Sequence, residues 1–241
     1  MNIVTLWHHD PHPAQARLAD YIATAQFPAG AAFVWGLVSA TEAALEPTRQ
    51  VLLGQGHSVE VLRFEPPADP IRDDHAKHQR VTDLYNQLVP LLHEPTALFI
   101  EDDVIPCDAD AALRLGGLLD ASPESCAMVA GAYRSRPRPM GACAVTDQYL
   151  FWDKLPVGPA THTIPVRWAG AGLTIFRTSA LHSVMPFRFQ IDAKARKGWD
   201  IFVAEDFRRL GFTMLLAPGL RAEHCCPEVI AYCAKHGCQI A

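Results

Sequence analysis

Three adjacent carboxylates, Glu101, Asp102 and Asp103, follow directly after the short apolar run of residues 97–100. An apolar run of this length between polar residues predicts a buried strand, so the carboxylates would lie at its C-terminal end, where open α/β sheets bind their ligands. Neighbouring carboxylates repel one another, and burial makes it costly to ionise all three unless a cation lies among them. Oxygen ligands of this kind suit Mg²⁺ or Mn²⁺, ions that often share their coordination shell with substrate phosphates. The alternative is a solvated turn whose aspartates cap the helix expected from about residue 108.

A second acidic pair, Glu205 and Asp206, falls within a helix that is expected to follow residues 198–200 and to end at Gly211. The helical register turns three apolar side chains inward, namely Phe202, Phe207 and Leu210. Desolvation among them would raise the pKa of a carboxylate toward the range useful for a general base. His224 follows the strand expected at 212–217 and would lie in a loop. It is either a third ligand for an ion already held by carboxylates or an ordinary loop histidine.

The elements that must position these groups alternate along the chain. Strands are expected at 3–7, 33–38, 58–64 and 97–100, and helices at 14–25, 41–53 and 75–92. This order predicts an α/β domain of three layers, with a largely parallel central sheet flanked by helices. Beyond a helix at 111–119 and a strand at 126–133, strands at 141–151, 163–168, 172–176 and 212–217 predict a smaller mixed sheet region. The basic segment 134–139 is expected to be an exposed loop.

Two further segments could border a ligand. His8, His9 and Asp10 follow the first strand and face either a nucleotide or only solvent. Gly170 and Gly172 either let the backbone approach a ligand closely or serve a tight turn with a bulge.

Composition limits the class of protein. With 241 residues, 49% of them hydrophobic, the chain fits one large globular domain. Its net charge of -5 argues against broad non-specific binding of nucleic acids. No apolar run is long enough to span a bilayer, and the N-terminus lacks the pattern of a secretory leader, so we expect a cytoplasmic protein. The odd number of cysteines, 7, disfavours a disulfide framework. Four of them lie near His224 and His236 as either a structural zinc site or buried thiols, namely Cys225, Cys226, Cys233 and Cys238.

Taken in order, these features resemble the glycosyltransferases of GT-A fold, and most closely the large inverting family that includes the cellulose and chitin synthases. The likeness covers roughly residues 75–226. The D-x-D element of that family corresponds to residues 101–103, its Glu-Asp pair to Glu205 and Asp206, and its C-terminal histidine to His224. Arg80 and Asn86 resemble the family's contacts to the donor. Two departures are the glutamate that begins the D-x-D element and the Trp-His-His-Asp end of the first strand, at residues 7–10.

The resemblance implies a single GT-A domain over residues 1–241, with a nucleotide-sugar-binding half (1–106) and an acceptor-binding half (107–241). The donor would be a nucleotide-diphosphate sugar and the metal Mn²⁺ or Mg²⁺. Asp206 would be the catalytic base of an inverting transfer, and Glu205 would position the acceptor. The expected metal ligands are Glu101, Asp103 and His224. The expected donor-binding residues are Arg80, Asn86, Asp102, Gly170 and Gly172. The acceptor stays open among a glycan, a lipid, a small molecule, a protein and a modified nucleic acid, and so does the oligomeric state.

Two other classes compete with this interpretation. A sugar-phosphate nucleotidyltransferase would also place carboxylates on a metal at a strand end. It normally carries a glycine-rich, lysine-containing loop after the first strand, where this chain has Pro11, His12 and Pro13. The non-enzymatic alternative is a zinc-stapled binding module built from residues 224–238.

Overall fold

The structure is a computed structural model of the 241-residue chain. It describes residues 1–7, 13–38, 42–65, 73–135, 138–156, 162–191 and 196–238. His8, His9 and Asp10, which the sequence suggests as nucleotide contacts, lie outside the described residues.

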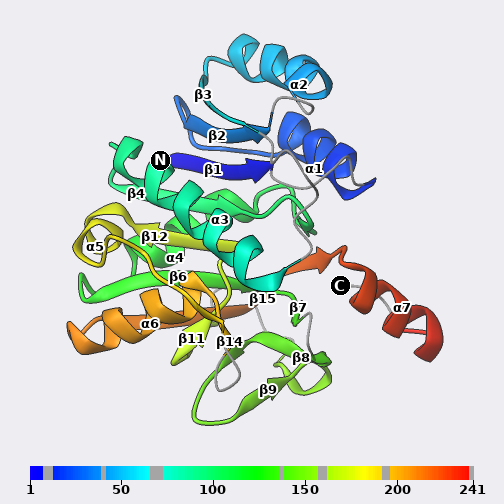
Figure 1. Ribbon diagram of the computed structural model, residues 1–241, viewed down its shortest axis with the longest axis vertical. Helices are drawn as coiled ribbons and strands as arrows, with labels where there is room; N and C mark the ends of the chain where they lie inside the picture. The colour runs from blue at the N-terminus through cyan, green and yellow to red at the C-terminus, as the bar shows by residue number, and fades with distance from the viewer. Residues whose placement is uncertain are drawn as a thin grey trace.

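A large, mostly parallel sheet runs through the molecule (Figure 1). Its strands, in spatial order, are β3 (Ser58–Phe64), β2 (Ala32–Val38), β1 (Asn2–Trp7), β4 (Thr96–Ile100), β12 (Leu173–Arg177), β6 (Cys126–Ala132), β15 (Thr213–His224) and β10 (Ile164–Pro165). β12 is antiparallel to both of its neighbours, and β10 is antiparallel to β15. The parallel strands therefore share one carboxyl edge, and β12 begins at that edge.

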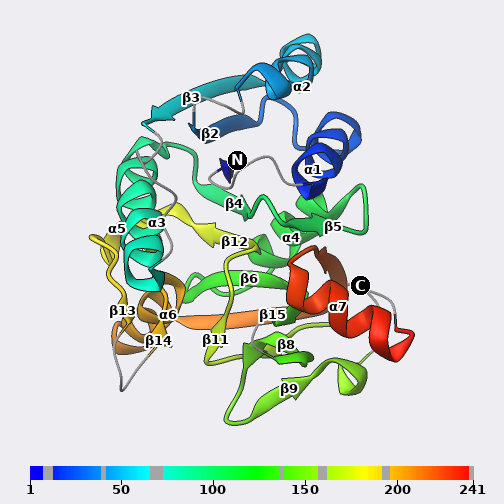
Figure 2. The same ribbon diagram turned by 45° about the vertical axis from the view of Figure 1, so that its right-hand side comes forward.

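Helices cover both faces of this sheet because successive strand residues alternate between two apolar clusters. One face packs against α1 (Pro13–Thr24), α2 (Glu42–Gly54) and α4 (Ala111–Asp120). The other packs against α3 (Asp74–Leu88), α5 (Thr178–Ser183) and α6 (Trp199–Arg209). In β4, for example, Leu98 faces the first set and Phe99 the second, each fully buried. Burial of such a side chain contributes about 1.5–3 kcal/mol. The predicted three-layer α/β domain is confirmed, and Figure 2 shows the two layers of helices on either side of the sheet.

A smaller antiparallel sheet lies below the C-terminal half of the large one (Figure 1). It contains β11 (Trp168–Ala169), β8 (Arg138–Val145), β7 (Arg134–Ser135) and β9 (Tyr149–Phe151). Short elements complete the described chain: β5 (Val104–Pro106), β13 (Gln190–Ile191), β14 (Arg196–Lys197), two single-turn helices at Val89–Leu91 and Trp152–Lys154, and α7 (Pro227–His236). Among the described residues, no helix combines the length and the apolar character needed to cross a bilayer.

The prediction of an exposed loop at 134–139 is wrong. Arg134 and Ser135 are buried and form β7, and β8 begins at Arg138. Burial of the arginine is compensated by the ring of Trp152, whose centroid lies 5.1 Å from the Arg134 guanidinium carbon and 4.7 Å from that of Arg221. Basic side chains that pack on an aromatic ring in this way leave no trace in a local sequence pattern.

Three other boundaries differ from the sequence prediction. The single strand expected at 141–151 is a hairpin of β8 and β9, and the strand expected at 163–168 is divided between β10 and β11. The strand expected at 212–217 continues to His224, because after an irregularity between Ala217 and Arg221 it pairs with β5. Leu210 is 51% exposed rather than inward, since α6 ends at Arg209.

Candidate functional site

The carboxyl edge of the large sheet gathers polar groups from distant parts of the chain. Glu101, Asp102 and Asp103 follow β4, and Arg134 follows β6. His224 ends β15, which pairs with β5 in the register His224 to Val104. The turn that contains Gly170 and Gly172 precedes β12, and the first turn of α6 carries Asp200. We call the group Glu101, Asp102, Asp103 and Asp200 the acidic edge.

Asp103 and His224 form a buried pair at this edge. The backbone N–H of Cys225 donates to the carbonyl of Asp103 at 2.7 Å, which holds the two chain segments together. His224 Nε2 then lies 3.4 Å from Asp103 Oδ2, with both side chains buried. His224 Nδ1 lies 2.6 Å from the carbonyl oxygen of Arg134. Because a carbonyl only accepts, Nδ1 carries a proton, and on a neutral ring Nε2 presents its lone pair to the carboxylate.

A positive charge is needed between these two groups. Burial on its own lowers the pKa of His224, but the side chains of Asp103 and Cys226 raise it by more, so that the net pKa lies at about 10. Among the described residues, the buried Nε2 has no well-aligned hydrogen-bond partner. The position therefore favours either a proton or a metal cation next to Asp103.

Asp200 lies in the first turn of α6 and acts electrostatically on groups that Glu101 also affects. Its Oδ2 accepts a hydrogen bond from Trp168 Nε1 at 3.2 Å, and its Oδ1 accepts from the backbone N–H of Ile201 at 2.9 Å. Burial raises the pKa of Asp200 to about 6, although these hydrogen bonds lower it in part. The buried thiol of Cys143 has a raised pKa, first because of burial and then because of the charges of Asp200 and Glu101. Both carboxylates thus act on the same interior group.

The two glycines make room for a tyrosine. A Cβ at Gly170 would lie 2.2 Å from the hydroxyl oxygen of Tyr133, and one at Gly172 would lie 2.8 Å from it. The N–H of Gly172 donates to this hydroxyl at 2.9 Å. Their close backbone approach is thus to Tyr133, whose ring packs edge-on to His224 with centroids 5.4 Å apart.

Asp102 is 1% exposed and turns toward α1, where Gln15 Nε2 donates to its Oδ2 at 3.0 Å. Two predicted donor contacts on α3 also bind the protein's own backbone. Arg80 Nη2 donates to the carbonyl of Glu65 at 2.9 Å. Asn86 forms two hydrogen bonds with the backbone of Phe187. Its Nδ2 donates to the Phe187 carbonyl at 3.0 Å, and its Oδ1 accepts from the Phe187 N–H at 2.6 Å.

The structure does not bring Asp206 and Glu205 to the acidic edge. Arg188 Nη2 lies 2.7 Å from Asp206 Oδ1, and Arg209 Nη2 lies 3.3 Å from the same oxygen. Glu205 pairs with Lys197 at 2.6 Å. β15 starts beside Cys126, the first residue of β6, so the C-terminal end of α6 lies at the amino edge of the sheet. Asp206 is six residues beyond Asp200, about 9 Å further along the helix axis.

The side chains present at the acidic edge fit a metal ion only in part. Among the described residues, no group of three or more His, Cys, Asp and Glu side chains is placed to hold a metal. The expected triad therefore reduces to Asp103 and His224, without Glu101. Two protein ligands suit Mg²⁺ or Mn²⁺, which complete their shell with water and phosphate oxygens. Within the described part of the chain the expected zinc site of residues 224–238 is not formed either, and none of the seven cysteines is in a disulfide.

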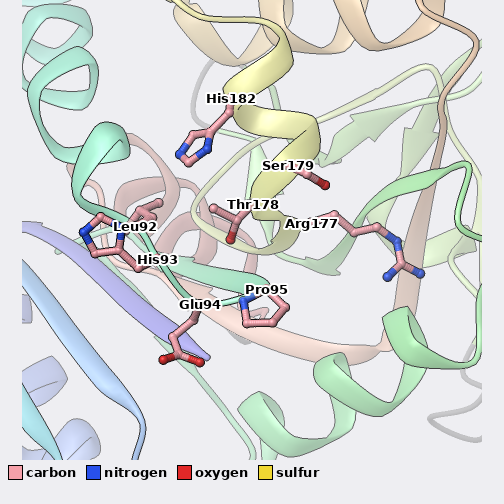
Figure 3. A pocket seen from close by; sticks show the side chains of 8 residues that line it. All are labelled: Leu92, His93, Glu94, Pro95, Arg177, Thr178, Ser179 and His182. Carbon is pink, nitrogen blue, oxygen red and sulfur yellow. The ribbon is translucent and has the colours of Figure 1, made fainter.

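A depression in the surface lies at the other edge of the sheet, where β4 begins and β12 ends (Figure 3). It is lined by Leu92, His93, Glu94, Pro95, Arg177, Thr178, Ser179 and His182. The guanidinium of Arg177 is already bound to the carbonyls of Cys126, Leu119 and Ser122. Glu94 binds the N-terminal ammonium group, and His182 Nε2 lies 3.1 Å from the carbonyl oxygen of Val89. We therefore take the acidic edge, and not this depression, as the candidate site.

Sequence reasoning missed Asp200 as a site residue, although a signal was present. α6 leads directly into β15, which starts at the amino edge of the sheet. A helix that packs on a sheet and leads into one of its strands runs antiparallel to that strand, so the first turn of α6 lies toward the carboxyl edge. The first acidic residue of α6 is Asp200, whereas the Glu205 and Asp206 pair lies in its last turns.

No protein-family model and no curated protein sequence matches the chain. Solved structures do match. TarS of S. aureus has a TM-score of 0.54 at 12% identity, with 92% of this chain and 36% of TarS covered. TarS residues 1–349 in complex with UDP give 0.54 at 12% identity, over 89% and 56% of the two chains. UDP-glucose pyrophosphorylase in complex with UDP-glucose gives 0.54 at 8% identity, over 98% of each chain. The chain thus has the GT-A fold, and it spans little more than a third of TarS.

Proposed function

We propose that the protein is a metal-dependent glycosyltransferase that moves a sugar from a nucleotide-diphosphate donor to an acceptor hydroxyl with inversion. The observation that carries this proposal is the buried pair of Asp103 and His224, 3.4 Å apart, at the carboxyl edge of a GT-A sheet. A carboxylate and an imidazole lone pair that face each other are stabilised by a shared cation, and a diphosphate completes the shell of such a cation.

In this proposal Asp103 and His224 hold Mn²⁺ or Mg²⁺, which when bound neutralises the charge that develops on the departing diphosphate. The carbonyl of Arg134 fixes the ring of His224 through Nδ1, so that Nε2 keeps its direction. Asp102 is buried and hydrogen-bonded to Gln15, so in this proposal it stabilises the turn of residues 101–103 and does not contact the donor. The base role given to Asp206 is not carried over, because two arginines already neutralise that carboxylate.

The two halves of the chain take different substrates in this proposal. Residues 1–106 supply β1 to β4 and would bind the nucleotide, whereas residues 107–241 supply the small sheet and α6 and would bind the acceptor. UDP-sugars are the first donors to test, because complexes with UDP and UDP-GlcNAc exist for the structural neighbour TarS.

Thermal unfolding with UDP-glucose or UDP-GlcNAc, with and without Mn²⁺, tests the proposal. Selective binding to the folded state raises the Tm by mass action, and a rise that requires Mn²⁺ is expected. Asp103→Asn and His224→Ala should each abolish the Mn²⁺-dependent part of the rise. Asp20→Asn, an exposed change on α1, should leave it intact. If neither nucleotide sugar raises the Tm under any condition and no UDP is released, the proposal fails.

A sugar-phosphate nucleotidyltransferase remains a second candidate, because UDP-glucose pyrophosphorylase matches 98% of this chain over 98% of its own length. That activity would consume a nucleoside triphosphate and a sugar phosphate and release pyrophosphate. Incubation with UTP and glucose 1-phosphate separates the two candidates, since pyrophosphate release supports the nucleotidyltransferase and UDP release from a nucleotide sugar supports the glycosyltransferase.

A further inference from the structure

The helix that follows β14 presents one carboxylate to the carboxyl edge of the sheet. Asp200 lies in the first turn of α6, immediately after Trp199, which is buried against Tyr85 with ring centroids 4.5 Å apart. Stacking of Phe187 on the same indole, at 5.1 Å, fixes this end of the helix further. The position of Asp200 is therefore set by packing rather than by a flexible loop.

Its carboxylate is oriented but not neutralised by the contacts that the structure gives it. Its hydrogen bonds come from Trp168 Nε1, from the Ile201 N–H and from its own backbone N–H, and all three donors are uncharged. A carboxylate has about four acceptor sites, so capacity for a further donor is left. A Cβ at position 198 would lie 2.8 Å from Asp200 Oδ1 and 3.7 Å from the His78 ring, so Gly198 keeps the space beside this oxygen open.

Asp200 and the carboxylates that follow β4 act electrostatically on the same side chains. The pKa of Tyr85 is raised well above its usual value, first by burial and then by the charges of Glu101, Asp102 and Asp200. The charges of Asp200 and Glu101 also raise the pKa of the Cys143 thiol. Asp206 by contrast is 11% exposed at its side chain and is bound by Arg188 and Arg209.

We propose that Asp200, rather than Asp206, is the general base that accepts the proton of the acceptor hydroxyl. This inference rests on the proposed glycosyltransferase function. As the acceptor oxygen forms its bond to the anomeric carbon, the bond from that carbon to the diphosphate oxygen breaks. The electron pair leaves with the nucleoside diphosphate, and the hydroxyl proton passes to Asp200, from which solvent removes it. A pKa of about 6 leaves the group mostly ionised at pH 7.5 yet more basic than an ordinary aspartate, which suits this task.

The test compares Asp200→Asn with Asp206→Asn, using UDP release from UDP-glucose or UDP-GlcNAc and donor binding by titration. Asparagine keeps one of the two acceptor oxygens that serve Trp168 and Ile201, but it cannot take a proton. For Asp200→Asn we expect a fall in the turnover number of about 100-fold or more, the typical contribution of a general base, with donor affinity within about twofold of wild type. For Asp206→Asn we expect a lower Tm, because two arginines lose their partner, and a turnover loss of less than about tenfold in the folded protein.

The outcomes separate the inference from the function on which it rests. Wild-type binding and UDP release, with release undiminished in Asp200→Asn, would overturn the assignment of the base and leave the glycosyltransferase intact. The assignment is likewise overturned if Asp206→Asn keeps its fold and donor affinity but loses release. A wild-type protein that neither binds nor cleaves any nucleotide sugar would remove both proposals together.

Discussion

At the scale of single residues, Asp200 links stability to pH. Its pKa of about 6 in the folded protein is above the value of about 3.9 in an unfolded chain. Between these values the folded state binds more protons than the unfolded state, so the free energy of unfolding falls as pH rises from about 4 to about 6. Asp200→Asn removes this pH-dependent penalty, so the stability of the variant relative to wild type should rise by roughly 1–3 kcal/mol between pH 4 and pH 7.5.

Urea unfolding of both proteins at pH 4 and at pH 7.5 measures this change in relative stability. Gln87→Ala, an exposed change on α3 that removes no titratable group, is the control and should show no such dependence on pH. A gain in stability that is equal at both values would mean that Asp200 is not the titrating group.

Gly170 and Gly117 offer a matched pair for testing the packing around Tyr133. A Cβ at Gly170 would meet the Tyr133 hydroxyl at 2.2 Å and the Cys143 sulfur at 2.5 Å, whereas one at Gly117 on α4 meets nothing within 4 Å. Gly170→Ala should therefore lower the free energy of unfolding by about 1–3 kcal/mol through overpacking. Gly117→Ala should raise it by about 0.5–1 kcal/mol, since alanine favours a helix. If chemical denaturation gives the same change in unfolding free energy for both variants, the turn before β12 accommodates the added Cβ without destabilising the fold.

At the scale of elements, Asn86 joins α3 to the segment that leads into β13. Its two hydrogen bonds with the Phe187 backbone place the stacked pair of Phe187 and Trp199. Asn86→Ala leaves both backbone groups without this partner and should cost about 1–3 kcal/mol of unfolding free energy. Gln87→Ala, one position along on the exposed side of the same helix, should change it by no more than about 0.5 kcal/mol. If Asn86→Ala instead binds the donor more weakly and keeps its stability, Asn86 contacts the donor, as the resemblance implies.

Most elements could be predicted because their residues carry a local pattern. The strands β1, β2 and β4 are short apolar runs, whereas β3 mixes polar and apolar residues, and the sequence predicts each of the four to within one residue. The errors fall where a distant partner decides the structure. In β7 the buried Arg134 packs on Trp152, and the extension of β15 to His224 pairs with β5. Neither partner is adjacent in sequence, so periodicity could not show them.

The same reason limits what the sequence predicts of the site as a whole. The prediction that the carboxylates after β4 meet a histidine more than a hundred residues later is met by Asp103 and His224. Asp103 and His224 lie close together because β4 and β15 both end at the carboxyl edge of the sheet. The pair of Glu205 and Asp206 was placed there by resemblance alone, whereas the direction of α6 carries it to the other edge. Helix direction is a property of the whole topology and is read only once the sheet order is known.

At the scale of the whole molecule, the site unites segments from five parts of the chain, and hydrogen exchange can detect them together. Binding of a UDP-sugar with Mn²⁺ should slow amide exchange at residues 101–104, 133–135, 168–172, 198–201 and 222–225, because each segment contributes to the acidic edge or supports it. The depression lined by Pro95, Arg177 and His182 lies at the opposite edge and serves as an internal control (Figure 3). Exchange there should not change on binding. Protection that is confined to residues 92–95 and 177–182 would move the ligand site to the amino edge, and Asp103 and His224 would then be a structural ion pair.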